Sequence, residues 1–291
     1  NTTGHSNVAV GSGALDANTT ANQNTAIGYL SLSTSTTGSD NTAVGRATLF
    51  DNTTGSQNTA VGKDALENNS TANDNTAVGY HALTANTTGT QNTAVGSLSL
   101  DANTTGNGNT ALGYQSATNT TTGTYNTAAG WLALDANSTG SYNTAIGTQS
   151  LDANTTASNN TAVGYHSLGA NTTGIDNVAV GVFALHSNTT ANSNSAFGRS
   201  SLQNNITGIN NVAIGRDALF ANTTASNNTG IGKSALEANT TGTNNVGVGR
   251  ESLNVNTTGS QNTAIGNKAL NVNTTADGNT AVGHISLGSN T

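Results

Sequence analysis

Few side chains in this chain are of the types that perform acid–base or metal chemistry, and the repeat described below keeps them apart. The sequence has 5 His, 7 Lys or Arg and 14 Asp or Glu among 291 residues, and no Cys. Catalysis needs several polar groups within hydrogen-bond reach, with at least one perturbed by burial or charge. The histidines are His5, His81, His166, His186 and His284. Only His81 and His166 share a place in the repeat, and at about 4.8 Å per repeat they lie too far apart to share a ligand. We therefore predict a non-enzymatic protein with no catalytic residue, no cofactor and no metal site.

Basic residues follow the repeat more closely than the histidines do. Each falls at one of two adjacent places: Arg46, Lys63, Arg199, Arg216, Lys233 and Arg250 at the first, and Lys268 at the second. The basic stripe is the set in consecutive repeats, namely Arg199, Arg216, Lys233 and Arg250. Such a stripe suits an anionic glycan, although we favour a solvated face that Asp217 and Glu251 partly neutralise. A net charge of -7 argues against nucleic acid as a partner.

Aromatic residues gather at two places in neighbouring repeats. Tyr114 and Trp131 share one place, and Tyr125 and Tyr142 share the other. Exposed aromatic faces bind sugar rings, so these four residues are candidate glycan contacts. Ordinary surface positions or a contact between chains are the alternatives.

An Asn-x-Thr triplet recurs in nearly every repeat and gives two interpretations. In a secreted protein of a glycosylating host it would carry a sugar. Alternatively, Asn-Thr-Thr-Gly is turn chemistry, in which Asn or Thr caps the local backbone, and this is the interpretation we favour. The candidate glycosylation sites are Asn18, Asn52, Asn86, Asn103, Asn137, Asn154, Asn171, Asn188, Asn222, Asn239, Asn256 and Asn273.

These residues are all positioned by one internal repeat of 17 residues. An Asn recurs at this spacing without insertion or deletion, and a Gly follows each one four residues later. The recurrent residues are Asn7, Asn24, Asn41, Asn58, Asn75, Asn92, Asn109, Asn126, Asn143, Asn160, Asn177, Asn194, Asn211, Asn228, Asn245, Asn262 and Asn279. Apolar residues also keep to fixed columns, which a disordered chain has no reason to maintain. The period predicts an all-β fold, a parallel β-solenoid of seventeen 17-residue coils that forms a single domain over residues 1–291.

Numbering the recurrent Asn as coil position 1 makes 75–91 a representative coil. Position 4 is aliphatic or Phe in all but one copy and position 9 is Leu in all but one, so we predict these two columns as the core. Position 3 is Ala or Gly and should point the opposite way, forming a smooth stripe suited to a chain-to-chain contact. Gly at position 5 predicts a corner with positive φ.

The position 1 column predicts an asparagine ladder. Identical side-chain amides in stacked strands can hydrogen-bond to one another at the strand repeat. A simple turn preference is the alternative, but turn sites usually admit Asp or Gly as well.

The unit Asn-Thr-Ala-Val-Gly, at 41–45 and 58–62, resembles the Asn-Ser-Val-Ala-Ile-Gly-type repeat of YadA-like trimeric autotransporter adhesin heads. The longer form, with Ala-Leu and Asn-Thr-Thr-Gly, is similar to repeats in phage tail-fibre proteins. This resemblance covers the whole chain and implies a left-handed β-roll, association of three chains and surface attachment. The 17-residue coil is longer than the head repeat of that family.

Unbroken periodicity and the shortage of catalytic groups predict a structural fibre or adhesin shaft, located outside the cell, at the cell surface or in a virion fibre. The sequence begins and ends in mid-coil, so we expect uncapped ends that stack or continue. The expected partner is a further copy of the chain, as a trimer or an end-to-end filament, with surface glycans as a second partner and no membrane insertion. An ice-binding or glycan-binding solenoid that presents regular Thr and Asn arrays is the alternative, since Thr recurs at position 14.

Overall fold

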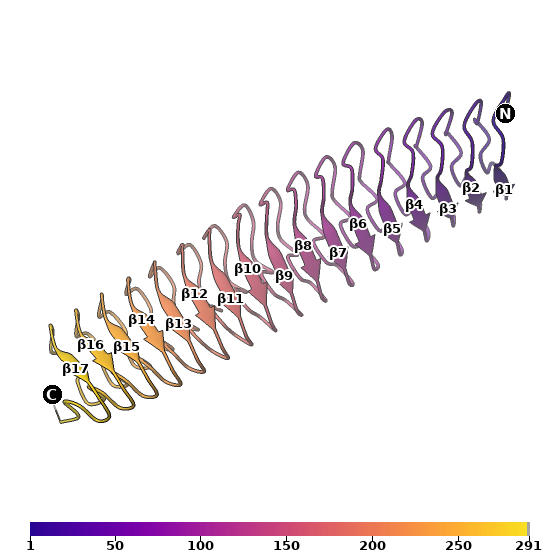
Figure 1. The fold of residues 1–291 in the computed structure, drawn as a ribbon. Coiled ribbons are helices and arrows are strands. Elements are labelled where there is room, and N and C mark those ends of the chain that lie inside the picture. The colour runs from indigo at the N-terminus through magenta and orange to yellow at the C-terminus, as the bar shows by residue number, and fades with distance from the viewer. Residues whose placement is uncertain (290–291) are drawn as a thin grey trace. The chain divides into compact units, whose positions relative to one another are not determined.

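The computed structural model describes residues 1–289. Those residues contain no helix and form a β-solenoid of 17 parallel strands with about 17 residues per turn, which confirms the predicted fold class. The chain divides into two compact units, Asn1–Asn143 and Thr144–Thr291. Figure 1 shows one short strand in each turn of both units. The handedness implied by the resemblance and the single domain stay predictions.

Every strand is 3 residues long and occupies coil positions 2 to 4. In the first unit the strands are β1 (Val8–Val10), β2 (Thr25–Ile27), β3 (Thr42–Val44), β4 (Thr59–Val61), β5 (Thr76–Val78), β6 (Thr93–Val95), β7 (Thr110–Leu112) and β8 (Thr127–Ala129). In the second they are β9 (Thr144–Ile146), β10 (Thr161–Val163), β11 (Val178–Val180), β12 (Ser195–Phe197), β13 (Val212–Ile214), β14 (Thr229–Ile231), β15 (Val246–Val248), β16 (Thr263–Ile265) and β17 (Thr280–Val282).

Within each unit, consecutive strands pair in parallel and in strict register. Ala43 lies beside Ala60 in β3 and β4, and Ala162 lies beside Ala179 in β10 and β11. Like residues therefore stack over like, and each coil position becomes a column of side chains along its unit. The stacking that the 17-residue period predicts is confirmed.

The core contains a different pair of columns from the predicted one. Ala77 at position 3 and Leu83 at position 9 are both 0% exposed, whereas Val78 at position 4 is half-buried. A methyl group at Gly230, another position 3 residue, would lie only 3.2 Å from Cγ of Leu219. Position 3 therefore faces the core Leu column, and the predicted chain-to-chain contact through position 3 is wrong. A three-residue strand turns only its middle residue inward, so positions 2 and 4 both face outward.

The corners of the coil rely on unusual backbone conformations. Gly at position 5 has φ between 125° and 142° in every coil, which confirms the predicted corner. A Cβ atom at Gly96 would lie 2.3 Å from the carbonyl oxygen of Gly113 in the next coil, so only Gly fits. Leu83 also has positive φ, at 56°, although Leu disfavours that region. Its N–H donates to the Ser99 carbonyl at 2.9 Å, and such contacts between coils hold the conformation.

Candidate functional site

The position 1 asparagines form the predicted ladder, largely through the backbone. Oδ1 of Asn75 accepts a hydrogen bond from the backbone N–H of Asn92 at 2.9 Å, and its Nδ2 donates to the Gly89 carbonyl at 2.9 Å. Direct amide–amide bonds join only some coils, such as Asn58 Nδ2 to Asn41 Oδ1 at 3.2 Å. These hydrogen bonds join each coil to the next, so the role of the position 1 column is structural.

A second asparagine ladder lies at position 12. Nδ2 of Asn86 donates to Oδ1 of Asn69 and to the Gly89 carbonyl, both at 2.9 Å. The Gly89 carbonyl therefore receives amides from both ladders. Sequence reasoning treated this column as a turn or a glycan acceptor. Its signal was the recurrence of Asn, which only Ser35 and Thr120 interrupt among the described full coils.

Burial of this second ladder corrects the glycosylation hypothesis. Each candidate acceptor is at most 2% exposed. A glycan on Nδ2 would replace a hydrogen-bonding hydrogen and displace the packed neighbouring coil, so the folded solenoid cannot carry one there. The sites concerned are Asn18, Asn52, Asn86, Asn103, Asn137, Asn154, Asn171, Asn188, Asn222, Asn239, Asn256 and Asn273.

The four aromatic candidates are exposed, but only two of them meet. Tyr125 and Tyr142 stack with ring centroids 5.3 Å apart at an interplanar angle of 16°. Tyr114 and Trp131 lie in adjacent coils at position 6 without a ring contact between them. The surface of residues 1–289 has no pocket to add further contacts. Glycan binding at these residues stays a prediction.

Two histidines that sequence reasoning kept apart lie together in the second unit. The His166 and His186 rings are 5.5 Å apart, and His186 Nδ1 lies 3.2 Å from the His166 carbonyl oxygen. His186 at position 10 thus reaches the backbone carbonyl of position 7 in the preceding coil. Thr84 does the same, since its Oγ1 donates to the Asp64 carbonyl at 3.0 Å. The position 7 and position 10 columns therefore lie on the same face of the coil, although they are three residues apart in the repeat. Across residues 1–289, no group of three or more His, Asp or Glu is arranged to hold a metal ion.

In the first unit, the cations surround one buried carboxylate. Asp64 at position 7 is 5% exposed. Its carboxylate lies 3.7 Å from Arg46 Nη1, 3.2 Å from Lys63 Nζ and 3.3 Å from His81 Nε2. Lys63 also lies over the Tyr80 ring, 5.1 Å from its centroid. Both position 6 cations of this unit are therefore paired within the coil stack.

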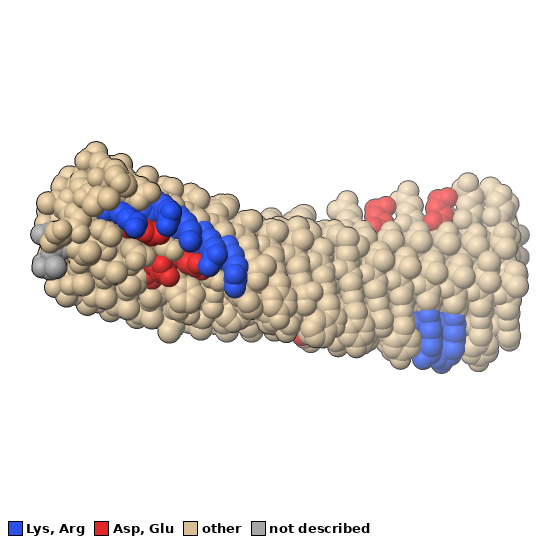
Figure 2. All heavy atoms as spheres, turned by 90° about the horizontal axis from the view of Figure 1, so that it is seen from below, with Lys and Arg blue, Asp and Glu red and all other residues tan. Residues whose placement is uncertain are grey.

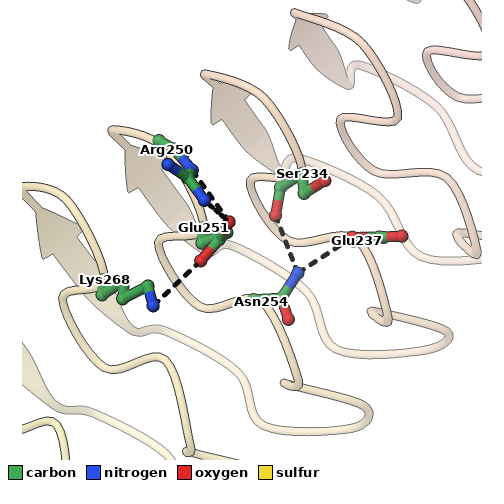
Figure 3. Close-up of polar contacts among 6 residues, drawn as sticks. All are labelled: Ser234, Glu237, Arg250, Glu251, Asn254 and Lys268. Carbon is green, nitrogen blue, oxygen red and sulfur yellow. Dashed lines mark hydrogen bonds and ion pairs between the residues drawn. The ribbon is translucent and has the colours of Figure 1, made fainter.

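In the second unit, the basic stripe forms a continuous band of cationic side chains beside a few acids (Figure 2). Arg216 Nε donates to Asp217 at 2.8 Å, and Arg250 Nη2 lies 2.6 Å from Glu251. Lys268 Nζ lies 3.4 Å from the other oxygen of Glu251 (Figure 3). Within the described part of the chain, Arg199 and Lys233 form no ion pair at 4.0 Å or less. The predicted stripe is present and only partly neutralised.

Four carboxylates have shifted pKa values, and the direction differs between Glu251 at position 7 and three acids at position 10. The hydrogen bond from Arg250 lowers the pKa of Glu251 below its ordinary value. Burial raises the pKa of Glu67, Asp101 and Asp135, which line position 10 of the first unit. Position 10 is therefore partly desolvated at these three residues.

Comparison with known proteins adds no relative, since no family model matches the chain and no curated protein matches it significantly. The resemblance to autotransporter heads and tail fibres therefore stays a prediction. Among residues 1–289, no helix has the length and apolar content needed to cross a bilayer.

Proposed function

We propose that this protein is a non-enzymatic, extracellular structural segment, a fibre or adhesin shaft built from stacked coils. The observation that supports it best is the outward column at position 4. Position 4 is Val, Ile, Leu or Phe in every coil except that of Ala129, and its side chain is half-buried or exposed throughout, so each unit has a continuous apolar ridge. Contiguous exposed apolar surface of this extent is typical of an interaction site.

A second copy of the chain is the partner that fits this ridge. The ridge repeats at the strand spacing of about 4.8 Å. A partner must have the same period to bury every coil equally, and another solenoid of this sequence has it. Thr at position 2 flanks the ridge in most coils and would keep its edge polar, as the rim of an interface is.

Sedimentation equilibrium over a range of protein concentrations tests self-association. Ile27→Glu with Val95→Glu would place charge on the ridge, at side chains exposed enough for the coil to tolerate it. The matched control is Thr20→Glu with Thr88→Glu at exposed position 14. We expect the wild type and the control to form the same oligomer and the ridge variant to be monomeric. A wild type that stays monomeric at every concentration would contradict the proposal.

Binding to a regular lattice such as ice is the second candidate. Thr at position 14 is exposed in every described coil, which makes a regular column of hydroxyls. The outward strand face adds Thr at position 2 beside the aliphatic residue at position 4, on a parallel sheet of constant register. Thermal hysteresis separates the candidates, because a shaft would show none. A hysteresis lost on Thr→Lys substitution at positions 2 or 14 would favour lattice binding.

A further inference from the structure

We propose that the basic stripe of the second unit binds a linear anionic polysaccharide that lies along the coils. This inference goes beyond the structural role and does not depend on self-association. It rests on the pairing of the cations, their regular spacing and the absence of a concave site.

The stripe retains cations that the fold does not neutralise. Arg199 and Lys233 have no carboxylate within ion-pairing distance among the described residues, and each lies one coil from another cation of the stripe. Like charges stacked in neighbouring coils repel one another. This repulsion brings no structural gain within the chain. An anionic partner bound to the stripe would supply the negative charge that offsets it.

The nearby acids are engaged elsewhere. Glu251 accepts from both Arg250 and Lys268. Glu237 lies in the same coil as Lys233, yet its Oε2 accepts a hydrogen bond from Asn254 Nδ2 at 3.0 Å (Figure 3). Asn254 also donates to the Ser234 carbonyl at 3.1 Å, which fixes its amide. Glu237, the acid closest to Lys233 in the sequence, is thus held by Asn254 and forms no ion pair with Lys233.

The arrangement of the charges selects the class of ligand. The paired Arg216 separates Arg199 from Lys233, so the unpaired cations lie two coils apart, about 10 Å at the strand spacing. An extended polysaccharide with carboxylates or sulfates on its rings presents anions along one line at a comparable repeat. The single line of cations, without a pocket in residues 1–289, suits a polymer that lies on the surface. The second unit has 5 basic and 6 acidic residues, which disfavours duplex nucleic acid.

The test measures binding of the full chain to immobilised polygalacturonate, with neutral dextran as the blank and dextran sulfate as the sulfate-bearing arm. We expect Arg199→Gln with Lys233→Gln to weaken binding about ten-fold, which corresponds to about 1.4 kcal/mol. Arg46→Gln with Lys63→Gln is the matched control, because it removes two position 6 cations that Asp64 already pairs. The control should bind within about two-fold of the wild type, and added salt should weaken binding by all proteins.

A gain-of-function variant guards against misfolding as the cause of any loss. Glu251→Gln releases Arg250 and Lys268 and should tighten binding to polygalacturonate. Stronger binding to dextran sulfate than to polygalacturonate would identify sulfate as the anion and still support the proposal. Equal losses in the stripe and control variants, or no binding to either polyanion above dextran, would overturn it.

Discussion

Each unit places three basic residues around an acid at position 7, yet the two units neutralise that acid differently. Asp64 meets Lys63 from its own coil, His81 from the next coil and Arg46 from the preceding one. Glu251 meets the equivalent Arg250 and Lys268. Its third counterpart, Lys233 in the preceding coil, forms no ion pair.

The difference follows the burial of the acid. The Asp64 side chain is 8% exposed and keeps its carboxylate at the corner, within reach of three coils. The Glu251 side chain is 22% exposed and meets only cations of its own and the next coil. Asp217, the other position 7 acid of this unit, is 20% exposed and meets Arg216 of its own coil but not Arg199 of the preceding one. An acid at position 7 that is more exposed than Asp64 thus goes with an unpaired cation in the preceding coil, whether that acid is Asp217 or Glu251.

Truncation of the core Leu beside each corner should have the largest effect and should be the same in both units. Leu66 and Leu253 are 0% exposed. Leu→Ala at either should cost about 2–5 kcal/mol, since the narrow coil leaves a cavity that neighbouring coils cannot fill. Urea unfolding measures both variants. A loss in one unit more than about twice that in the other would show that the backbones differ, and would break the comparison based on charge alone.

Removal of the buried acid should have the next largest effect. Asp64→Asn keeps the shape but leaves Arg46, Lys63 and His81 without their shared carboxylate. We expect a loss of about 1–2 kcal/mol at neutral pH, below the cost of breaking a fully buried pair because the basic partners are partly exposed. Glu251→Gln, the matched change in the second unit, should cost less. Equal losses in urea unfolding would contradict the role given to burial.

Lowering the pH should reduce the contribution of Glu251 specifically. Its folded-state pKa is below the ordinary 4.5, so its stabilisation is fully present above pH 4.5 and is lost as the pH falls through the lowered value. The melting temperature of the wild type minus that of Glu251→Gln should therefore shrink below pH 4.5. Added salt should shrink it too, because the pair is exposed. A melting-temperature difference that changes with neither pH nor salt would show that Glu251 acts through packing.

The period in the sequence predicted much of the fold. The strand register within each unit, the position 1 asparagine ladder and the glycine corner all follow from residues that recur every 17 positions. The inward face could not be predicted, because Ala and Val both suit either side of a strand and a three-residue strand has no alternation to read. Positive φ at Leu83 has no signal either, since contacts between coils impose it against the preference of Leu.

The candidate site divides in the same way. The sequence places the cations of the basic stripe in one column because they all occupy the same coil position. Their pairing could not be predicted, since the reach of Asp64 and Glu251 depends on where the corner directs each carboxylate. His166 and His186 were missed for a related reason: positions 7 and 10 become neighbours only once the coil turns.

The smallest expected effect has the opposite sign and concerns position 10 of the first unit. Burial raises the folded-state pKa of Asp135 above the ordinary 3.8, although a hydrogen bond with Thr118 opposes the shift. The ionised carboxylate therefore opposes folding at neutral pH, and this penalty disappears as the pH falls through the raised folded value towards 3.8. Asp135→Asn should stabilise the first unit at pH 7 by no more than about 0.5 kcal/mol and lose that advantage in acid. Urea unfolding at both pH values measures it, and a destabilised Asp135→Asn at pH 7 would show that the hydrogen bond with Thr118 outweighs desolvation.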